Sequence, residues 1–263
     1  MPITAFQKDM LQLLAANRKP ESHLAGGTAI NRADSSPRYS ADIDFFQDLA
    51  DDVFAAAQAD AALLASQGYT VTWMLRQPYL QRVSVRRGDE ALKLEWCYDS
   101  SFRFFPVQPD PEFGYCLHPA DLSTNKVLAM AGRSEIRDFI DILYLHETYL
   151  SLGAISWAAC GKDLGFNPCS LLDFAKRHMK FREDDLAGEH LVRPVCLTDL
   201  KEDWHTAVAQ AEGLIAELPA AEVGCLYLSP SFSPITPDPA AADFSVAIRH
   251  FCSIRGAWPT VAP

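Results

Sequence analysis

The sequence of 263 residues predicts an α+β fold, in which a mixed sheet with helices is followed by a mainly helical C-terminal domain. Two observations lead to this class. Between residues 69 and 96, the segments YTVTWMLR, LQRVSVRR and ALKLEW alternate polar and apolar side chains, as half-buried strands do. Beyond Pro106, apolar residues recur at helical spacing instead. We therefore expect two domains, at 1–118 and 119–263.

Local signals predict the N-terminal elements. Residues 4–18 carry apolar side chains at helical spacing behind Thr4, a suitable N-cap. The stretch HLAGG, from His23, is typical of a short strand entering a turn, and DIDFF, at 42–46, of a second strand. The Ala-rich segment 51–67 predicts a helix that ends before Gly68, because glycine is favoured just past a helix C-terminus.

The remaining elements are a β-meander and a run of helices. The three alternating segments form the meander, with RGDE as the turn between its last two strands. Four further segments predict helices: 119–131, 135–148, 169–179 and 200–217. The Pro/Ser-rich segment 229–239 predicts an extended connector.

Composition excludes several function classes. A formal charge of −11 argues against a protein coated in basic residues, so any nucleic-acid site must be confined to a local surface. The seven cysteines are odd in number and form no C-x-x-C pair, which favours reduced thiols over a disulfide framework or a zinc ribbon. No apolar run approaches the ~20 residues that span a bilayer. We expect a cytoplasmic protein with no membrane partner.

Two aspartates in the second strand are the strongest candidate for chemistry. Because side chains alternate along a strand, Asp42 and Asp44 project from one face while Ile43 and Phe45 project from the other. Two adjacent carboxylates repel each other, and a divalent cation bound to their oxygens removes that conflict. The alternative is a strand end whose acids simply face water.

Neighbouring residues strengthen the metal hypothesis. Gly26-Gly27-Thr28 follows a strand and opens a short helix, so backbone N–H groups and the Thr28 hydroxyl can converge on phosphate oxygens. In ALKLEW, Glu95 is a third carboxylate that the meander can bring beside the aspartates. Three carboxylates can hold two Mg²⁺ ions. An ordinary solvent-facing Lys/Glu surface is the alternative for this strand.

Taken together, Gly-Gly-Thr, Asp-Ile-Asp-Phe-Phe and an acid in a later strand resemble the DNA polymerase β superfamily of nucleotidyltransferases. The segment DLSTNKVLAMAGRSEIRDFIDILYL, 121–145, is similar to a pattern found in the AbiEii/AbiGii-type nucleotidyltransferase toxins: Asp-Leu, a lysine in the following helix, then Arg-Asp-x-x-Asp-Leu. The resemblance covers roughly residues 20–148 and implies a polymerase-β-like fold for the N-terminal domain.

The resemblance also implies roles for individual residues. It implies that Gly26, Gly27 and Thr28 cradle phosphates, where many polymerase-β-like enzymes have Ser at the last of these positions. Metal binding is implied for Asp42, Asp44 and Glu95, the last standing where members often have Asp. The helical lysine corresponds to Lys126, and the acids of the last motif to Asp138 and Asp141, all three as catalytic residues.

Helical spacing adds to the assignment of the last motif. Asp138 and Asp141 are three residues apart and share one polar helix face, while the apolar residues around them form the other. This stripe can reach an interdomain cleft, where the ammonium of Lys126 would neutralise triphosphate charge. A surface salt-bridge ladder is the alternative.

The function expected from these motifs is a Mg²⁺-dependent nucleotidyltransferase that moves a nucleoside monophosphate from a nucleoside triphosphate to a tRNA or protein acceptor. The resemblance implies the toxin of a toxin–antitoxin pair, with a cognate antitoxin as partner. Two alternatives remain: a catalytically silent nucleotide- or partner-binding module of the same fold, and a DxD metal-dependent glycosyltransferase. Arg82 and Arg86 share a strand face with Ser84 and form either a basic wall for an RNA end or a solvated sheet face.

Overall fold

The structure, a computed structural model, describes residues 2–260. The chain packs as two compact units. The first comprises the chain up to Ser101 together with Pro106–His118. The second comprises Phe102–Phe105 and the chain from Pro119 onward. The short segment Phe102–Phe105 therefore belongs to the second unit although its neighbours in sequence belong to the first.

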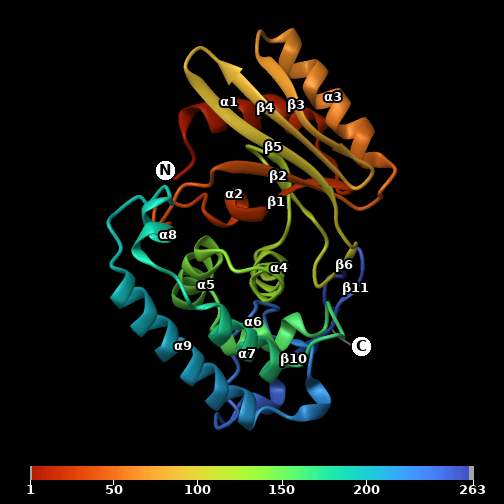
Figure 1. The fold of residues 1–263 in the computed structure, drawn as a ribbon. Coiled ribbons are helices and arrows are strands. Elements are labelled where there is room, and N and C mark those ends of the chain that lie inside the picture. The colour runs from red at the N-terminus through yellow and green to blue at the C-terminus, as the bar shows by residue number, and fades with distance from the viewer. Residues whose placement is uncertain (1, 261–263) are drawn as a thin grey trace. The chain divides into compact units, whose positions relative to one another are not determined.

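A mixed sheet forms the centre of the first unit (Figure 1). Among the described residues, seven strands pair in the order β3-β4-β5-β2-β1-β8-β7. Strand β2 runs parallel to β5 and antiparallel to β1, and β1 runs parallel to β8. The strands are β1 (Ser22–Ala25), β2 (Asp42–Gln47), β3 (Thr70–Gln77), β4 (Leu80–Arg87), β5 (Glu90–Tyr98), β7 (Gln108–Asp110) and β8 (Gly114–Cys116). The expected α+β class is confirmed.

The helices of the first unit begin and end where local chemistry favours it. They are α1 (Ala5–Leu14), the 3₁₀ turn η1 (Ala15–Asn17), α2 (Gly26–Ile30) and α3 (Asp52–Ser66). Thr4 caps α1 as expected, because its hydroxyl accepts a hydrogen bond from the backbone N–H of Gln7 at 3.1 Å. Helix α3 is followed by Gly68, whose φ of +84° suits glycine.

The two faces of the sheet have different environments. Helix α3 packs across β3, β4 and β5 (Figure 1), and its buried Asp60 accepts a hydrogen bond from the indole N–H of Trp96 on β5. Phe45 and Leu94 are buried on this helix-covered face. The alternate residues of the same strands, among them Asp44 and Glu95, are half-buried and project from the opposite face.

Helices dominate the second unit. Their bounds are α4 (Pro119–Gly132), α5 (Ile136–Thr148), α6 (Leu152–Ala159), α7 (Pro168–His178), α8 (Glu183–Ala187) and α9 (Leu197–Glu217), with the 3₁₀ turns η2 (Ala220–Glu222) and η3 (Phe244–Val246). Two small antiparallel pairs join β6 (Phe102–Arg103) to β11 (Ser253–Ile254) and β9 (Leu226–Leu228) to β10 (Ile248–His250). No helix within residues 2–260 has the length and apolar character needed to cross a bilayer.

The sequence pattern missed some of these elements for identifiable reasons. Every residue of α6 is buried, so its sequence LGAISWAA shows no polar face and no helical periodicity. Strands β6 to β11 beyond residue 101 have only two or three residues each, which is too short for alternation to be visible. The expected helices are present with ends within three residues of their predicted bounds, except that the helix expected over 4–18 divides into α1, which ends at Leu14, and the 3₁₀ turn η1.

Candidate active site

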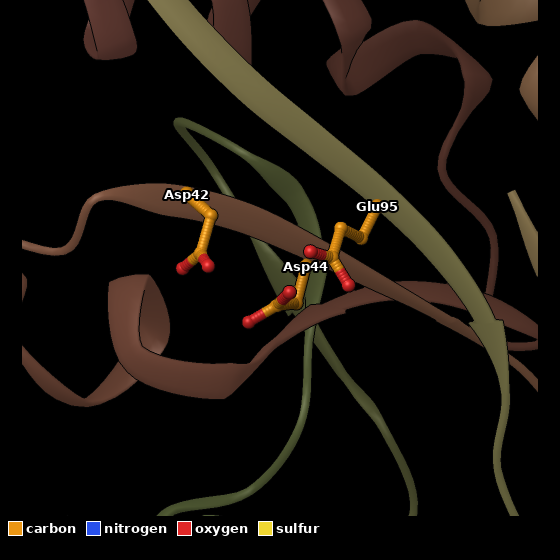
Figure 2. Close-up of side chains that lie close together, drawn as sticks. All are labelled: Asp42, Asp44 and Glu95. Carbon is orange, nitrogen blue, oxygen red and sulfur yellow. The ribbon is translucent and has the colours of Figure 1, made fainter. Parts of the chain in front are cut away.

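Three carboxylates converge on the face of the sheet opposite α3. Asp42 and Asp44 lie on β2, and Glu95 lies directly beside Asp44 on the parallel strand β5. One oxygen atom from each of the three carboxylates lies within 4.8 Å of the other two. Figure 2 shows all three side chains projecting from the same side of the two strands. The structure thus brings together the acids that the sequence singled out.

The buried face of the same strands fixes this register. Ile43 and Phe45 on β2 and Leu94 and Trp96 on β5 are fully or almost fully buried. A slip of one residue would expose these side chains and bury the carboxylates, so the apolar residues specify which face the acids occupy. The acid cluster is therefore a consequence of core packing on the other side of the sheet.

Gly26 lies against Asp44 and leaves no space for a side chain. Its φ of +66° is in the left-handed region that favours glycine. A Cβ at this position would lie 2.0 Å from Oδ2 of Asp44. Both the backbone conformation and the close approach therefore require glycine here, and the start of α2 contacts the carboxylate of Asp44 directly.

The second glycine of the turn contacts the loop that precedes β2. A Cβ at Gly27 would lie 2.8 Å from Oγ of Ser40 and 2.9 Å from Nη2 of Arg38. The Ser40 hydroxyl in turn donates a hydrogen bond to Oδ1 of Asp42 at 3.2 Å. Sequence reasoning missed Ser40 and Arg38, because nothing in the local pattern RADSSPRYS indicates which loop residue folds back onto the acids.

Thr28 positions the strand rather than facing open space. Its hydroxyl donates to the backbone carbonyl of Asp42 at 2.5 Å, and the residue is buried. The sequence suggested a hydroxyl aimed at phosphate oxygens, and the geometry differs because the end of β2 lies close enough to take the hydrogen bond. Thr28 therefore ties α2 to the first acid of the cluster.

Two cations neutralise part of the acidic charge. Nζ of Lys93 lies 3.0 Å from Oδ2 of Asp42 and 2.8 Å from Oε1 of Glu95, and Nε of Arg82 lies 2.9 Å from the same Glu95 oxygen. Burial lowers the pKa of Lys93, but its hydrogen bonds to Glu95 and Asp42 outweigh burial, so the pKa is raised overall. Lys93 is therefore a firmly charged ammonium between two of the acids.

The charges of the acid cluster also affect the pKa of a neighbouring thiol, that of Cys97. Burial raises the pKa of Cys97 well above its usual range, and the charges of Asp44 and Glu95 add to the increase. A protonated, half-buried thiol is a poor nucleophile and a poor metal ligand. Oxygen atoms are therefore the donors that this face of the sheet offers.

The donor set suits a hard divalent cation. Mg²⁺ binds carboxylate oxygens at ~2.0–2.1 Å, so two oxygens on opposite sides of one ion are about 4.2 Å apart. The observed limit of 4.8 Å is close to this value, and small side-chain rotations bring the three acids within it. Binding requires the ammonium of Lys93 to move away from the oxygens of Asp42 and Glu95.

The second unit holds the other predicted residues in one buried ion network. Nζ of Lys126 lies 3.0 Å from Oδ1 of Asp138 and 2.9 Å from Oδ2 of Asp141. Arg133, which the sequence pattern missed, donates to both oxygens of Asp138 at 2.8 and 3.0 Å. Both aspartates are fully buried, so the alternative of a surface salt-bridge ladder is wrong.

The charges in this network hold one another in the ionised state. Burial raises the pKa of Asp138, but the hydrogen bond from Arg133 and the charge of Lys126 outweigh burial, so the pKa is lowered overall. The expected placement of Lys126, Asp138 and Asp141 opposite the acidic strand stays a prediction.

The chain is similar to known proteins in sequence pattern and in fold. The model of the family described as "Nucleotidyl transferase AbiEii toxin, Type IV TA system" matches residues 10–222. The fold is similar to that of JHP933 from Helicobacter pylori (16% identity, TM-score 0.51), with 81% of this chain and 92% of that chain covered. It is also similar to MenT4, a nucleotidyltransferase toxin from Mycobacterium tuberculosis (13% identity, TM-score 0.52), with 82% and 83% covered. No curated protein sequence matches the chain.

Proposed function

The chain belongs to the AbiEii family of nucleotidyltransferase toxins, and from this premise we propose that it transfers a nucleoside monophosphate from a nucleoside triphosphate to an acceptor with the help of Mg²⁺. The observation that carries the proposal is the convergence of Asp42, Asp44 and Glu95 beside the Gly26 turn. Hard oxygen donors suit Mg²⁺, and a glycine backbone directly against one of them can offer N–H groups to phosphate.

In the proposed reaction, an acceptor hydroxyl oxygen forms a bond to the α-phosphorus of the triphosphate. The bond from that phosphorus to the oxygen bridging the α- and β-phosphates breaks, and pyrophosphate leaves. The hydroxyl proton passes to a carboxylate of the cluster or to water. Bound Mg²⁺ would neutralise phosphate charge and lower the pKa of the attacking hydroxyl. The protein contributes mainly by positioning and charge stabilisation.

We assign the metal-binding roles to Asp42, Asp44 and Glu95, and the phosphate contact to the backbone of Gly26 and Gly27. Thr28 and Ser40 then act as positioning residues, since both hold Asp42 by hydrogen bonds. The support for the phosphate role is the position of these glycines directly against Asp44 and the Ser40 loop, beside the acids that would hold the metal.

Lys93 has two successive roles in this proposal. Before substrate binds, its ammonium bridges Asp42 and Glu95 and offsets their repulsion. With a divalent cation held by the acids, the same ammonium would lie free beside the site and could bind a phosphate oxygen. A flexible lysine stem suits such an exchange better than the planar fork of an arginine.

Lys126 is proposed to contact the triphosphate, with Asp138 and Asp141 as positioning residues that hold its ammonium. Their two hydrogen-bonded contacts with Lys126 fix the position of the charge, which supports this division of roles. Two carboxylates hold the ammonium of this buried lysine in a fixed position, which suits charge stabilisation in a transition state.

The proposal also covers the acceptor of the nucleotide and the protein partner. We propose a tRNA or protein acceptor and a cognate antitoxin, because the family is described as a type IV toxin–antitoxin system. With a net charge of −11, an RNA acceptor must bind through a local basic surface. Arg86, exposed on the same sheet face as Lys93, is the cation best placed to begin such a surface.

A labelling experiment tests the proposal. The full chain is incubated with each of the four α-labelled nucleoside triphosphates, Mg²⁺, and either total RNA or a lysate, and covalently attached label is located. We expect transfer by the parent protein, loss in Asp44→Asn, and full transfer in Asp89→Asn, which removes the same charge from an exposed turn. Triphosphate binding without transfer to any acceptor would favour the silent binding module instead.

A further inference from the structure

A separate pocket lies on the helix-covered face of the first unit's sheet. It measures about 200 Å³ and is bounded by η1, β1, β2 and α3. Its polar lining includes Arg18, Ser22 and Gln47, and small alanines of α3, among them Ala56 and Ala59, leave the space open. Gln47 lies on the opposite face of β2 from Asp42 and Asp44, so the pocket is distinct from the acid cluster.

The polar groups of this pocket lack partners. Gln47 is 0% exposed, and neither its amide nitrogen nor its amide oxygen has a hydrogen-bond partner among the described residues. The Ser22 hydroxyl and two nitrogen atoms of Arg18, Nε and Nη1, are equally buried and equally without partners in residues 2–260. Burying polar groups without hydrogen bonds costs stability, so a cluster of them around one cavity indicates a place for a polar ligand.

The neighbouring contacts hold Arg18 rigidly. Its third guanidinium nitrogen, Nη2, forms an ion pair with Asp60, whose oxygens also accept from Asn17 at 2.8 Å and from Trp96 at 2.7 Å. The guanidinium stacks over the ring of Phe45, 4.1 Å from its centroid. Asp60 thus accepts three hydrogen bonds, and these contacts hold the remaining N–H groups of Arg18 in place for a ligand.

The chemistry of the lining selects the ligand class. The groups left without partners in the described part of the chain can all donate: the Arg18 N–H groups, the Gln47 amide and the Ser22 hydroxyl. The lining also holds two carboxylates, but Asp60 pairs with Arg18, and Asp52 lies 3.5 Å from Lys19 at the exposed edge. Burial lowers the pKa of Arg18, and the charge of Asp60 offsets only part of that effect, so a further negative charge nearby is favourable.

The volume of the pocket limits the ligand to a small molecule. A volume near 200 Å³ is below the ~300–1,000 Å³ of sites for drug-sized ligands, yet far above the ~30 Å³ that one water occupies. We propose that the pocket bounded by Arg18, Ser22 and Gln47 binds a small oxyanion, either inorganic phosphate or a short carboxylate. This site does not depend on the nucleotidyltransferase reaction proposed above.

Titration of the full chain with sodium phosphate and, separately, sodium acetate tests the proposal. The titrations are run at constant ionic strength with EDTA and are followed by calorimetry and by the NMR signals of the Trp96 indole and Gln47 amide. We expect saturable binding of at least one anion and shifts of both signals. Phosphate alone indicates a phosphoryl ligand, acetate alone a carboxylate ligand, and both indicate a general oxyanion site.

Variants separate this pocket from the acid cluster. Gln47→Met removes the amide at similar length, and Ala59→Leu fills the space from the helix surface without touching a buried polar group. Both should weaken binding at least 10-fold, whereas Ala62→Leu, an exposed change on the same helix outside the pocket, should leave it unchanged. The proposal is overturned if neither anion binds saturably up to about 10 mM. It is also overturned if binding survives undiminished in both Gln47→Met and Ala59→Leu.

Discussion

Replacing Gly26 by alanine should abolish nucleotide transfer, whereas the same replacement at Gly88 should not. The two glycines have nearly equal backbone conformations, with φ of +66° and +62°. Alanine in the left-handed region costs about 1–2 kcal/mol, so both variants should lose this much stability. The backbone effect is therefore matched, and any further difference reports on what surrounds each Cβ.

The surroundings differ sharply. A Cβ at Gly88 meets nothing within 4 Å of the described structure, while a Cβ at Gly26 would lie 2.0 Å from an Asp44 oxygen. Restoring an ordinary contact requires a movement of about 1 Å by the carboxylate or the turn. A misplacement of that size in an active site costs roughly 10²-fold in rate.

Transfer of α-labelled nucleotide and urea unfolding, measured on both variants and the parent protein, test the reasoning. We expect both variants to unfold at lower urea, Gly88→Ala to retain transfer within about two-fold, and Gly26→Ala to fall at least ~10²-fold. Normal transfer by a folded Gly26→Ala protein would refute the proposal that the contact between Gly26 and Asp44 positions a catalytic carboxylate.

Three further predictions concern charge. Without metal, Asp44→Asn should be as thermally stable as the parent or slightly more stable, because the substitution relieves carboxylate repulsion. The same variant should lose Mg²⁺-dependent transfer. A lower melting temperature with normal nucleotide incorporation would favour a structural role for Asp44. Asp138→Asn should reduce the free energy of unfolding, measured with urea, by an amount near the lower end of the ~3–5 kcal/mol typical of broken buried pairs, because Lys126 keeps its contact with Asp141. The exposed control Asp173→Asn should show no such loss. The pKa of Asp138 is lowered in the folded protein, so the stability that its carboxylate contributes is complete above the unfolded pKa of ~3.9 and is lost as pH falls through the folded pKa. The free energies of unfolding of the parent and Asp138→Asn should therefore converge as pH falls below about 4. A difference that stays constant with pH would contradict this.

Much of the fold could be predicted from the sequence because its central strands carry a strong alternating signal. In β4 and β5, Val83, Val85, Leu94 and Trp96 are buried at every second position, so the pattern and the packing agree. Helix α6 could not be found in the same way, because a helix buried on all sides has no periodic polar face. Strands of two or three residues give no pattern to detect.

The candidate site was predictable where residues act through strand geometry. Asp42, Asp44 and Glu95 follow from alternation and from the pairing of neighbouring strands. The contributions of Lys93 and Ser40 depend on side-chain rotamers and loop closure, which local sequence does not determine. Thr28 illustrates the same limit, since its hydroxyl bonds to the Asp42 carbonyl through a contact fourteen residues away in sequence.

The register between β2 and β5 links the two sites of the first unit. It places Asp44 beside Glu95 on one face and Phe45 beside Trp96 on the other. Phe45 supports the Arg18 guanidinium, and Trp96 donates to the Asp60 carboxylate that pairs with Arg18. The oxyanion pocket and the acid cluster are therefore held by adjacent residues of the same two strands. Because packed strands resist independent movement, a change that displaces Phe45 or Trp96 must also displace the carboxylates one residue away.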